Sequence, residues 1–210
     1  MDRRDFVKIG LSAVAAGALG AGASAAPLKP IETRPLGRTG HRSSIIALGG
    51  IVVSQESQEH ANRIVEHALR NGVNHFDVAP TYGDAEIKLG EALRGKRERV
   101  FLACKTVKRT RQDAEKELRA SLERLQTDYF DLYQFHGLDK PEDLETAFGP
   151  EGALQAMLDA REKGIIRHIG MTGHNPDNFL TALRRFPLET CMFPINFAIH
   201  LHSDYGKRLI

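Results

Sequence analysis

Four side chains that can transfer or stabilise a proton stand at or near the ends of short apolar runs. Asp77 ends one run, and Tyr82 follows it by five residues in a loop bounded by Pro and Gly. Lys105 and His136 end the next two runs. A phenol beside a carboxylate, an ammonium and an imidazole can act as a proton donor. The pattern indicates an active site and therefore an enzyme.

Each of these residues has a structural explanation when it is taken alone. Asp77 could cap a loop or helix, and Tyr82 could be a loop aromatic. Lys105 could end a strand in solvent, and His136 could be a polar residue with its hydrogen bonds satisfied. Their joint occurrence at three consecutive strand ends favours the active-site interpretation.

Apolar runs and helical stripes alternate along the chain. Strands that recur every ~25–40 residues, each followed by a helix, predict parallel βα units. Residues 110–113 read as a capping box, and residues 175–176 read as an N-cap followed by Pro at the first helical position. The expected strands are residues 45–48, 73–77, 100–105, 129–136, 168–172 and 191–197.

This rhythm fits both a doubly wound sheet and a (β/α)8 TIM barrel. Reactive side chains at the carboxyl ends of several consecutive strands favour the barrel, because barrel sites are built at that face. Residues 33–44 predict an N-terminal β-hairpin that plugs the opposite mouth. The fold class is therefore an α/β barrel preceded by a hairpin.

Eight units close such a barrel, and the sequence supplies about six. Residues 204–210 begin what reads as the sixth helix and stop without a cap. Strands one and six would then be unpaired edges, which soluble proteins usually avoid. We therefore expect a partial barrel domain over residues 26–210 that lacks strands seven and eight.

The composition is that of an ordinary globular domain. The 210 residues are 41% hydrophobic and 27% charged, with a net charge of +2. This balance gives no electrostatic reason to expect nucleic acid as a partner. Cys104 and Cys191 lie in apolar runs and suit neither a redox pair nor a zinc site. His200 and His202 lack a third ligand at suitable spacing, so no metal site is predicted.

Residues 1–25 resemble a twin-arginine signal peptide. Arg3 and Arg4 precede Phe6 and Lys8, an uncharged Ala/Gly-rich run follows, and residues 23–25 offer a small-residue cleavage site. The alternative is a membrane anchor, but 18 weakly apolar residues barely span the ~30 Å hydrocarbon core. We expect the twin-arginine export machinery as a partner, a periplasmic or exported location with cytoplasmic retention as the alternative, and no stable membrane span in the mature form.

Five motifs, in order, make the chain from about residue 33 onward resemble the aldo-keto reductases, a family of (β/α)8 barrels that reduce carbonyls with NADPH. Any one motif alone would be weak. Together they cover almost all of the chain after the signal-like segment. They read RPLGRTG at 34–40, FDVAPTYG with LGEAL at 76–93, FLACKT at 101–106, SLERLQTDYFDLYQFH at 121–136 and HIGMTGH at 168–174.

The resemblance implies that the family's catalytic tetrad falls on Asp77, Tyr82, Lys105 and His136. Carbonyl reduction delivers a hydride to carbon while the oxygen takes a proton, which Tyr82 would donate. A free phenol has a pKa near 10, and a neighbouring ammonium such as Lys105 favours the phenolate. Asp77 would hold Lys105 by a charge-assisted hydrogen bond, and His136 would orient the carbonyl and stabilise charge on its oxygen.

The resemblance also implies cofactor contacts at Thr172 and Asn196. The family offers Ser or Thr and then Asn to the nicotinamide carboxamide, and this sequence reads Thr172-Gly173-His174. His174 either replaces the missing Asn or does not. Asn196 stands near a position where Gln is common. NADP is the implied cofactor and a small carbonyl compound the implied substrate. NAD stays open because the residues that bind the pyrophosphate and the adenosine 2′-phosphate are expected after strands seven and eight.

Two other interpretations stay open. A barrel aldolase could use Lys105 as a Schiff-base nucleophile, although Asp77 and Tyr82 would then have no matched roles. The chain could also be a catalytically inactive fragment or a cofactor-binding pseudoenzyme.

Overall fold

The computed structural model describes residues 31–202 and 206–209, so the predicted signal segment lies outside the described residues. A curled sheet of six parallel strands forms the centre of the fold, with strand order β3-β4-β5-β6-β7-β8. The strands are β3 (Leu48–Gly49), β4 (His75–Asp77), β5 (Phe101–Thr106), β6 (Phe130–Phe135), β7 (Ile166–Thr172) and β8 (Thr190–Met192).

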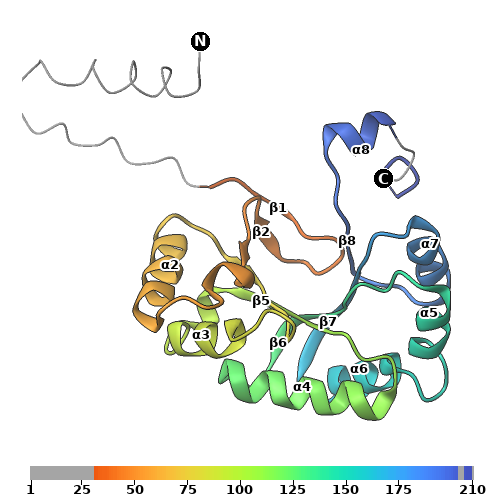
Figure 1. The fold of residues 1–210 in the computed structure, drawn as a ribbon, viewed down its shortest axis with the longest axis horizontal. Coiled ribbons are helices and arrows are strands. Elements are labelled where there is room, and N and C mark those ends of the chain that lie inside the picture. The colour runs from red at the N-terminus through yellow and green to blue at the C-terminus, as the bar shows by residue number, and fades with distance from the viewer. Residues whose placement is uncertain (1–30, 203–205, 210) are drawn as a thin grey trace, which may run out of the picture.

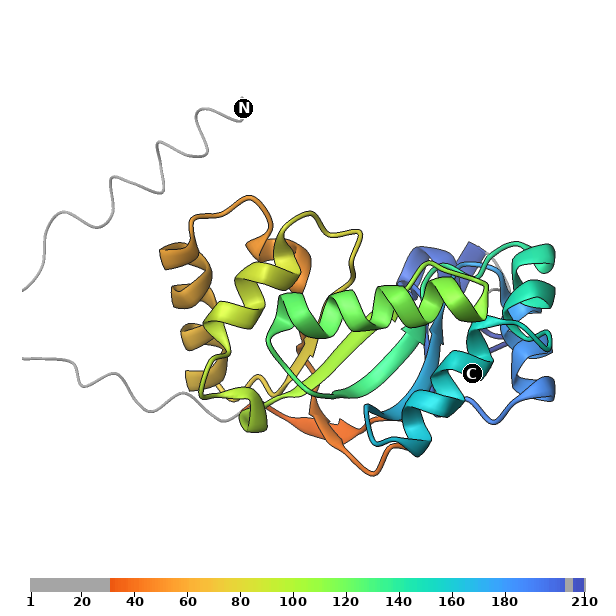
Figure 2. The ribbon, with the colours of Figure 1, turned by 90° about the horizontal axis from the view of Figure 1, so that it is seen from below.

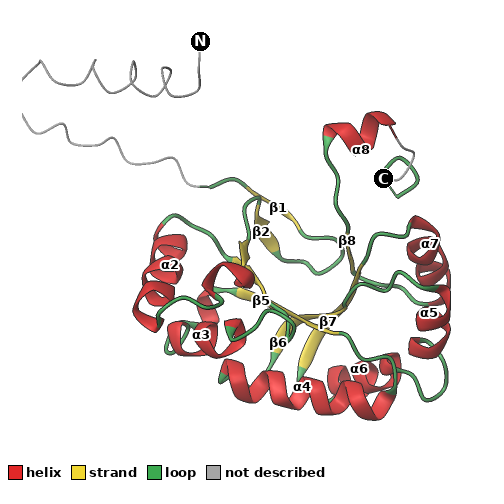
Figure 3. Cartoon of the chain, in the orientation of Figure 1, coloured by secondary structure: helices red, strands yellow, loops and turns green. Residues whose placement is uncertain are grey.

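Helices α2 to α7 lie around the convex side of this sheet, whereas α8 stands beyond β8, as Figures 1 and 3 show. A doubly wound sheet reverses its strand order at a switch point and carries helices on both faces. Here the order is sequential throughout, so the half-barrel prediction is confirmed and the doubly wound alternative is wrong. The helices are η1 (Gly50–Val53), α2 (Gln58–Arg70), α3 (Ala85–Ala92), η2 (Arg97–Arg99), α4 (Arg111–Leu125), α5 (Pro141–Ala147), α6 (Ala153–Glu162), α7 (Pro176–Arg185) and α8 (Phe197–His202).

Local sequence signals explain where the long outer helices begin. The Thr110 hydroxyl accepts a hydrogen bond from the Asp113 backbone N–H, which is the N-cap half of the expected capping box of α4, and it donates to the Asp113 carboxylate. The Asn175 side chain accepts from Asp177 N, and Pro176 occupies the first turn of α7. Both predicted helix starts are confirmed.

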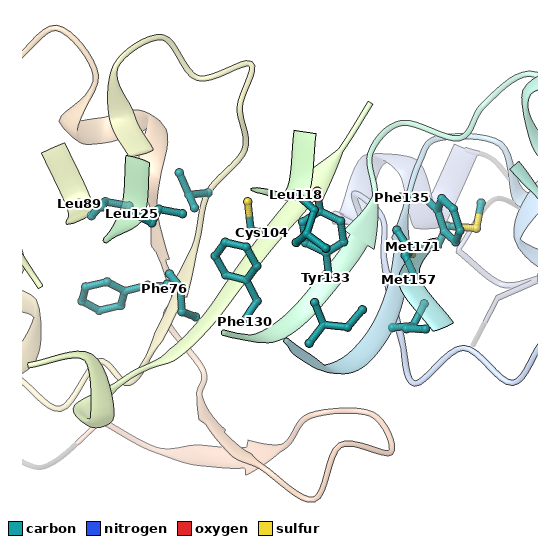
Figure 4. Packing of buried hydrophobic residues seen from close by; sticks show 14 of the residues in the cluster. Phe76, Leu89, Cys104, Leu118, Leu125, Phe130, Tyr133, Phe135, Met157 and Met171 are labelled. Carbon is teal, nitrogen blue, oxygen red and sulfur yellow. The ribbon is translucent and has the colours of Figure 1, made fainter. Parts of the chain in front are cut away.

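The main hydrophobic core lies between the sheet and these helices (Figure 4). Alternate residues of β5 and β6 point to opposite faces. Leu102 and Cys104 belong to the outer core, whereas Phe101 and Ala103 pack with Leu132 inside the half-barrel. By the same alternation Lys105 belongs to the inner face, at the carboxyl end of β5.

The N-terminal hairpin lies at the amino ends of the strands, away from that edge (Figure 2). Its strands β1 (Thr33–Pro35) and β2 (Arg42–Ser44) pair antiparallel. Asn74, just before β4, bonds Ser44 N at 2.7 Å and Arg42 O at 2.9 Å. Arg38 N donates to Glu189 O, just before β8, at 3.0 Å. The hairpin therefore joins one side of the curled sheet to the other.

Close contact at the tip of the hairpin explains its glycine. Gly37 has φ +50°, and a Cβ there would lie 2.0 Å from Glu189 O. Any side chain at this position would force the hairpin away from the β8 segment.

Two predicted strands differ from the observed ones. At residues 45–48 only Leu48 joins β3, because Ile45 N donates to Glu32 O and so continues the hairpin pairing. At residues 191–197 the strand β8 ends at Met192, and the chain then leads into α8. The apolar residues of both stretches read as buried strands, but Ile45, Ile46, Ile195 and Phe197 are exposed.

Two histidines predict a pH-dependent free energy of unfolding: His41 in the hairpin, and His75 of β4, which contacts the hairpin. His75 is buried, its Nδ1 lies 2.9 Å from the Ser43 hydroxyl, and burial lowers its pKa from the ordinary 6.5. His41 stacks on Phe101, and burial lowers its pKa too. The unfolded chain binds protons more readily at these histidines than the folded chain does. The free energy of unfolding is therefore highest above about pH 6.5 and decreases below it, by at most ~1.4 kcal/mol per histidine and pH unit.

Urea unfolding of the wild type and of His75→Gln at pH 7.5, 6.0 and 5.0 measures this loss. We expect the wild type to lose stability on acidification and His75→Gln to lose less. His67→Gln, which changes an exposed histidine on α2, should follow the wild type. An equal pH dependence in all three proteins would contradict the prediction.

Candidate active site

The four predicted tetrad residues lie at one edge of the sheet. Asp77 ends β4, Lys105 stands near the end of β5, and His136 directly follows β6. Tyr82 lies in the loop between β4 and α3. Because the strands are parallel and adjacent, their carboxyl ends share this edge.

Lys105 is the centre of the cluster. Its side chain is buried, with a residue exposure of 1%, and its Nζ donates to the Asp77 carboxylate oxygen Oδ2. The same Nζ donates to Val78 O at 3.2 Å and to the Tyr82 hydroxyl at 3.3 Å. Three oxygens therefore surround the three donors of one ammonium group.

Asp77 has a second partner that the sequence reasoning missed. Gln134 of β6 is fully buried, and its Nε2 donates to Asp77 Oδ1 at 3.2 Å. Gln134 pairs in register with Lys105 across β5 and β6. The two carboxylate oxygens of Asp77 are thus held by different strands. A polar residue two positions before His136, inside an apolar run, is the signal that could have identified it.

Tyr82 and His136 face each other across the edge. Their ring centroids are 5.8 Å apart and the rings meet at 89°. The turn that carries Tyr82 is closed by a bond from Tyr82 N to Ala79 O at 3.0 Å. Gly83 follows with φ +59°, and a Cβ there would lie 2.6 Å from the Ser54 hydroxyl. The glycine lets the loop close against η1.

The pKa of His136 is lowered from its ordinary value. Burial is the largest cause, the positive charges of Lys105 and Arg109 add to it, and Asp77 opposes it. His136 Nδ1 is buried and has no hydrogen-bond partner among the described residues. A neutral imidazole at this place can hydrogen-bond a polar group brought into the site.

Of the two predicted cofactor residues, Thr172 lies at the same edge. It ends β7 and is 7% exposed. Its hydroxyl accepts a bond from Gly137 N at 3.0 Å, beside His136. Among the described residues no acceptor is found for the hydroxyl proton of Thr172, so this proton can be donated to a group bound at the site.

Asn196 lies elsewhere than expected. It is exposed, and its side-chain oxygen accepts from Ile199 N at 3.0 Å at the start of α8. It therefore lies beyond β8 rather than within a sixth strand. His174, at the place of the missing Asn, bonds Asp139 through Nδ1 at 3.0 Å.

His200 and His202 also lie on α8. In a helix, residues two apart do not face each other. Among residues 31–202 and 206–209, no group of three or more metal-ligating side chains is found.

Comparisons with known proteins agree with this geometry. A family model described as "Aldo/keto reductase family" matches residues 46–201. The chain belongs to the aldo/keto reductase family. The resemblance expected from the five motifs is thereby confirmed.

The relatives extend well beyond the matched part. The chain is 31% identical to the aldo-keto reductase YhdN of Bacillus subtilis over 164 residues, which cover 71% of this chain and 48% of that protein. It thus spans about half the length of this curated relative.

No helix in the described part of the chain is long and apolar enough to cross a membrane.

Two solved structures of the family share this half-barrel. The holo form of the aldo-keto reductase AKR11C1 from Bacillus halodurans superposes with a TM-score of 0.69 at 29% identity, covering 79% of this chain and 58% of that one. The Bombyx mori aldo-keto reductase AKR2E4 in complex with NADP gives 0.62 at 27% identity, covering 80% and 59%.

The buried ion pair of this aldo/keto reductase predicts a strong coupling between two substitutions. Lys105→Met leaves the carboxylate of Asp77 buried without its counter-charge, which should cost about 3–5 kcal/mol of unfolding free energy. The double variant Asp77→Asn, Lys105→Met removes both charges and should recover part of that loss. Urea unfolding of both single variants and the double variant forms the cycle; strictly additive losses would contradict the coupling.

Proposed function

We propose that this chain carries the proton-transfer site of an NADP(H)-dependent reductase that converts aldehydes or ketones to alcohols. The observation that carries the proposal is the Lys105 ammonium, which donates to both the Asp77 carboxylate and the Tyr82 hydroxyl. Such a cluster serves a reaction in which an oxygen gains a proton. Reduction of a carbonyl is such a reaction.

In this proposal Tyr82 donates its hydroxyl proton to the carbonyl oxygen. The bond from Tyr82 O to hydrogen breaks, a new O–H bond forms on the product alcohol, and Tyr82 is left as a phenolate. The Lys105 ammonium, 3.3 Å from that oxygen, stabilises the phenolate until a solvent proton replaces the lost one. Asp77, held by Gln134, keeps Lys105 in place.

The remaining role in the proton transfer falls to His136. Its imidazole, neutral because its pKa is lowered, would donate a hydrogen bond to the substrate oxygen. This bond and the Tyr82 hydroxyl would approach the same oxygen from two directions. The carbonyl carbon would then be oriented toward the hydride donor.

The residues at this edge fit a nicotinamide cofactor at its reacting end. The bound cofactor would supply the hydride and so complete the two-electron reduction. The Thr172 hydroxyl, buried and with a free proton, is the group we propose for the carboxamide of the nicotinamide. Asn196, engaged with α8, is the weaker choice. The proposal of NADP as the cofactor is supported by the NADP complex of the Bombyx mori relative, and NAD stays open as the alternative.

The Schiff-base aldolase is the less favoured function. Its lysine must attack as a neutral amine, whereas Lys105 donates to three oxygens, including a carboxylate. Borohydride trapping of an aldehyde on Lys105, read as a mass increase, would favour the aldolase over the reductase.

The decisive test is the substitution Tyr82→Phe. Oxidation of NADPH by 4-nitrobenzaldehyde, followed at 340 nm, should fall by about 10²–10⁴-fold, because the proton donor is lost. Tyr129→Phe removes a hydroxyl that bonds Glu98 at the opposite end of the sheet, so its rate should stay near the wild-type value. An unchanged rate in Tyr82→Phe would refute the proposed proton donor. NADPH binding without turnover in the wild type would favour the cofactor-binding pseudoenzyme, and absence of both would favour the inactive fragment.

We further propose that residues 1–25 direct export through the twin-arginine pathway, with the periplasm as the destination. The support is the paired Arg3 and Arg4 before an uncharged Ala/Gly-rich run. Replacing both arginines by Lys in a fusion of the full 210-residue chain to a reporter protein should abolish export of the fusion. Replacing Lys29 and Lys96, which lie outside the signal, by Arg serves as the control; export that survives the loss of the arginine pair would contradict the proposal.

A further inference from the structure

The turn that carries His136 is held from both sides. On the β5 side, Arg109 Nη2 donates to His136 O at 2.9 Å and to Gly137 O at 3.1 Å. On the β7 side, Thr172 accepts from Gly137 N and from Leu138 N, both at 3.0 Å. The backbone of the turn is therefore fixed between the loop after β5 and the end of β7. A turn fixed in this way holds the imidazole of His136 in one orientation.

Arg109 is itself fixed by two helices. Its Nε lies 3.4 Å from an Asp143 carboxylate oxygen on α5, and its backbone O accepts from Ala153 N at the start of α6 at 2.8 Å. Its side chain is only 14% exposed. A guanidinium removed this far from water is costly unless its surroundings compensate for it. Asp143 and the two carbonyls of the turn provide part of that compensation, because Nε and Nη1 of Arg109 are buried and have no hydrogen-bond partner among the described residues.

The charges around His136 come from several elements. Lys105 of β5 and Arg109 lower the pKa of the imidazole, while Asp77 of β4 and Glu117 of α4 raise it. The Tyr82 ring lies against it at 5.8 Å. Asp77 is paired with Lys105, and an Asp143 carboxylate oxygen lies 3.4 Å from Arg109 Nε. The net effect of the Arg109 charge on His136 is still to lower the pKa of the imidazole.

We propose that Arg109 is a positioning residue that sets both the orientation and the charge environment of His136. It touches the backbone of the turn and acts on the reaction only through the imidazole. The proposal deepens the carbonyl-reductase function and rests on it for the role of His136. The geometry of the turn can still be tested without cofactor or substrate.

The test is a pH titration of the full 210-residue chain by NMR with ¹⁵N-labelled histidine. The chain has nine histidines, and the signal of His136 is assigned by its absence in His136→Gln. Arg109→Gln should raise the pKa of His136 by about 0.5 or more, because one nearby positive charge is lost. The matched control Lys108→Gln removes the same charge from the exposed neighbouring residue and should change it by less than about 0.2.

A second variant separates position from charge. Arg109→Lys keeps the positive charge but lacks the planar guanidinium that bonds the turn. We expect it to leave the pKa of His136 near the wild-type value and to move the His136 chemical shift at both ends of the titration. If Arg109→Gln does not fold, the His136 chemical shift in Arg109→Lys still tests the positioning role.

The proposal is overturned if folded Arg109→Gln leaves the His136 titration unchanged, or if Arg109→Lys gives the wild-type spectrum. Equal effects of Arg109→Gln and Lys108→Gln would also overturn it, because they would reflect net charge alone. A chain that reduces no carbonyl compound but shows the expected titrations refutes the proposed function and leaves the placement of Arg109 standing.

Discussion

A fully buried ammonium group constrains the whole reactive edge of this protein. Removing such an ion from water costs several kcal/mol unless oxygens replace its hydration shell. The Nζ of Lys105 finds the Asp77 carboxylate, the Val78 carbonyl and the Tyr82 hydroxyl. Two of these groups belong to the end of β4 and one to the loop that follows. These contacts fix the end of β4 and this loop relative to Lys105, and they thereby position the hydroxyl of Tyr82.

The parallel register of the sheet brings these side chains together. Asp77 pairs with Ala103, two residues before Lys105, and Lys105 pairs with Gln134. Alternate residues of a strand share one face, so Lys105, Gln134 and then His136 all meet at the inner edge. At the amino ends of the same strands the hairpin connects Asn74 with Glu189 and maintains the curvature. The candidate active site and the hairpin contacts thus lie at opposite ends of one sheet.

The sequence predicted the parts of the site that depend on strand periodicity. Asp77, Lys105 and His136 end apolar runs, and parallel strands bring such ends together whatever the rest of the chain does. Gln134 and the contacts of Arg109 depend instead on which side chains meet across neighbouring elements, and strand spacing does not encode that. Asn196 was misplaced for a different reason. An apolar run through Phe197 reads as a strand, but Pro194 lacks the backbone N–H that a strand needs, and the chain turns into α8.

The position of each group in the sheet explains why the proton-transfer groups and the cofactor groups differ in how firmly they are held. In the described part of the chain β3 pairs only with β4, and β8 only with β7. The residues near both outer strands include exposed apolar side chains, among them Ile45, Ile46, Met192 and Phe197. Asp77, Lys105 and Gln134 lie on β4, β5 and β6, each with a paired strand on both sides.

The cluster around Lys105 is consequently supported on both sides, since β3 pairs with β4 next to Asp77 and β7 pairs with β6 next to Gln134. Thr172 stands one strand from the β8 edge, and its bonds run inward to Gly137 and Leu138. In the proposed reaction, the proton would therefore come from a cluster at the centre of this half-barrel, whereas the proposed cofactor contact at Thr172 lies next to an outer strand with exposed apolar neighbours.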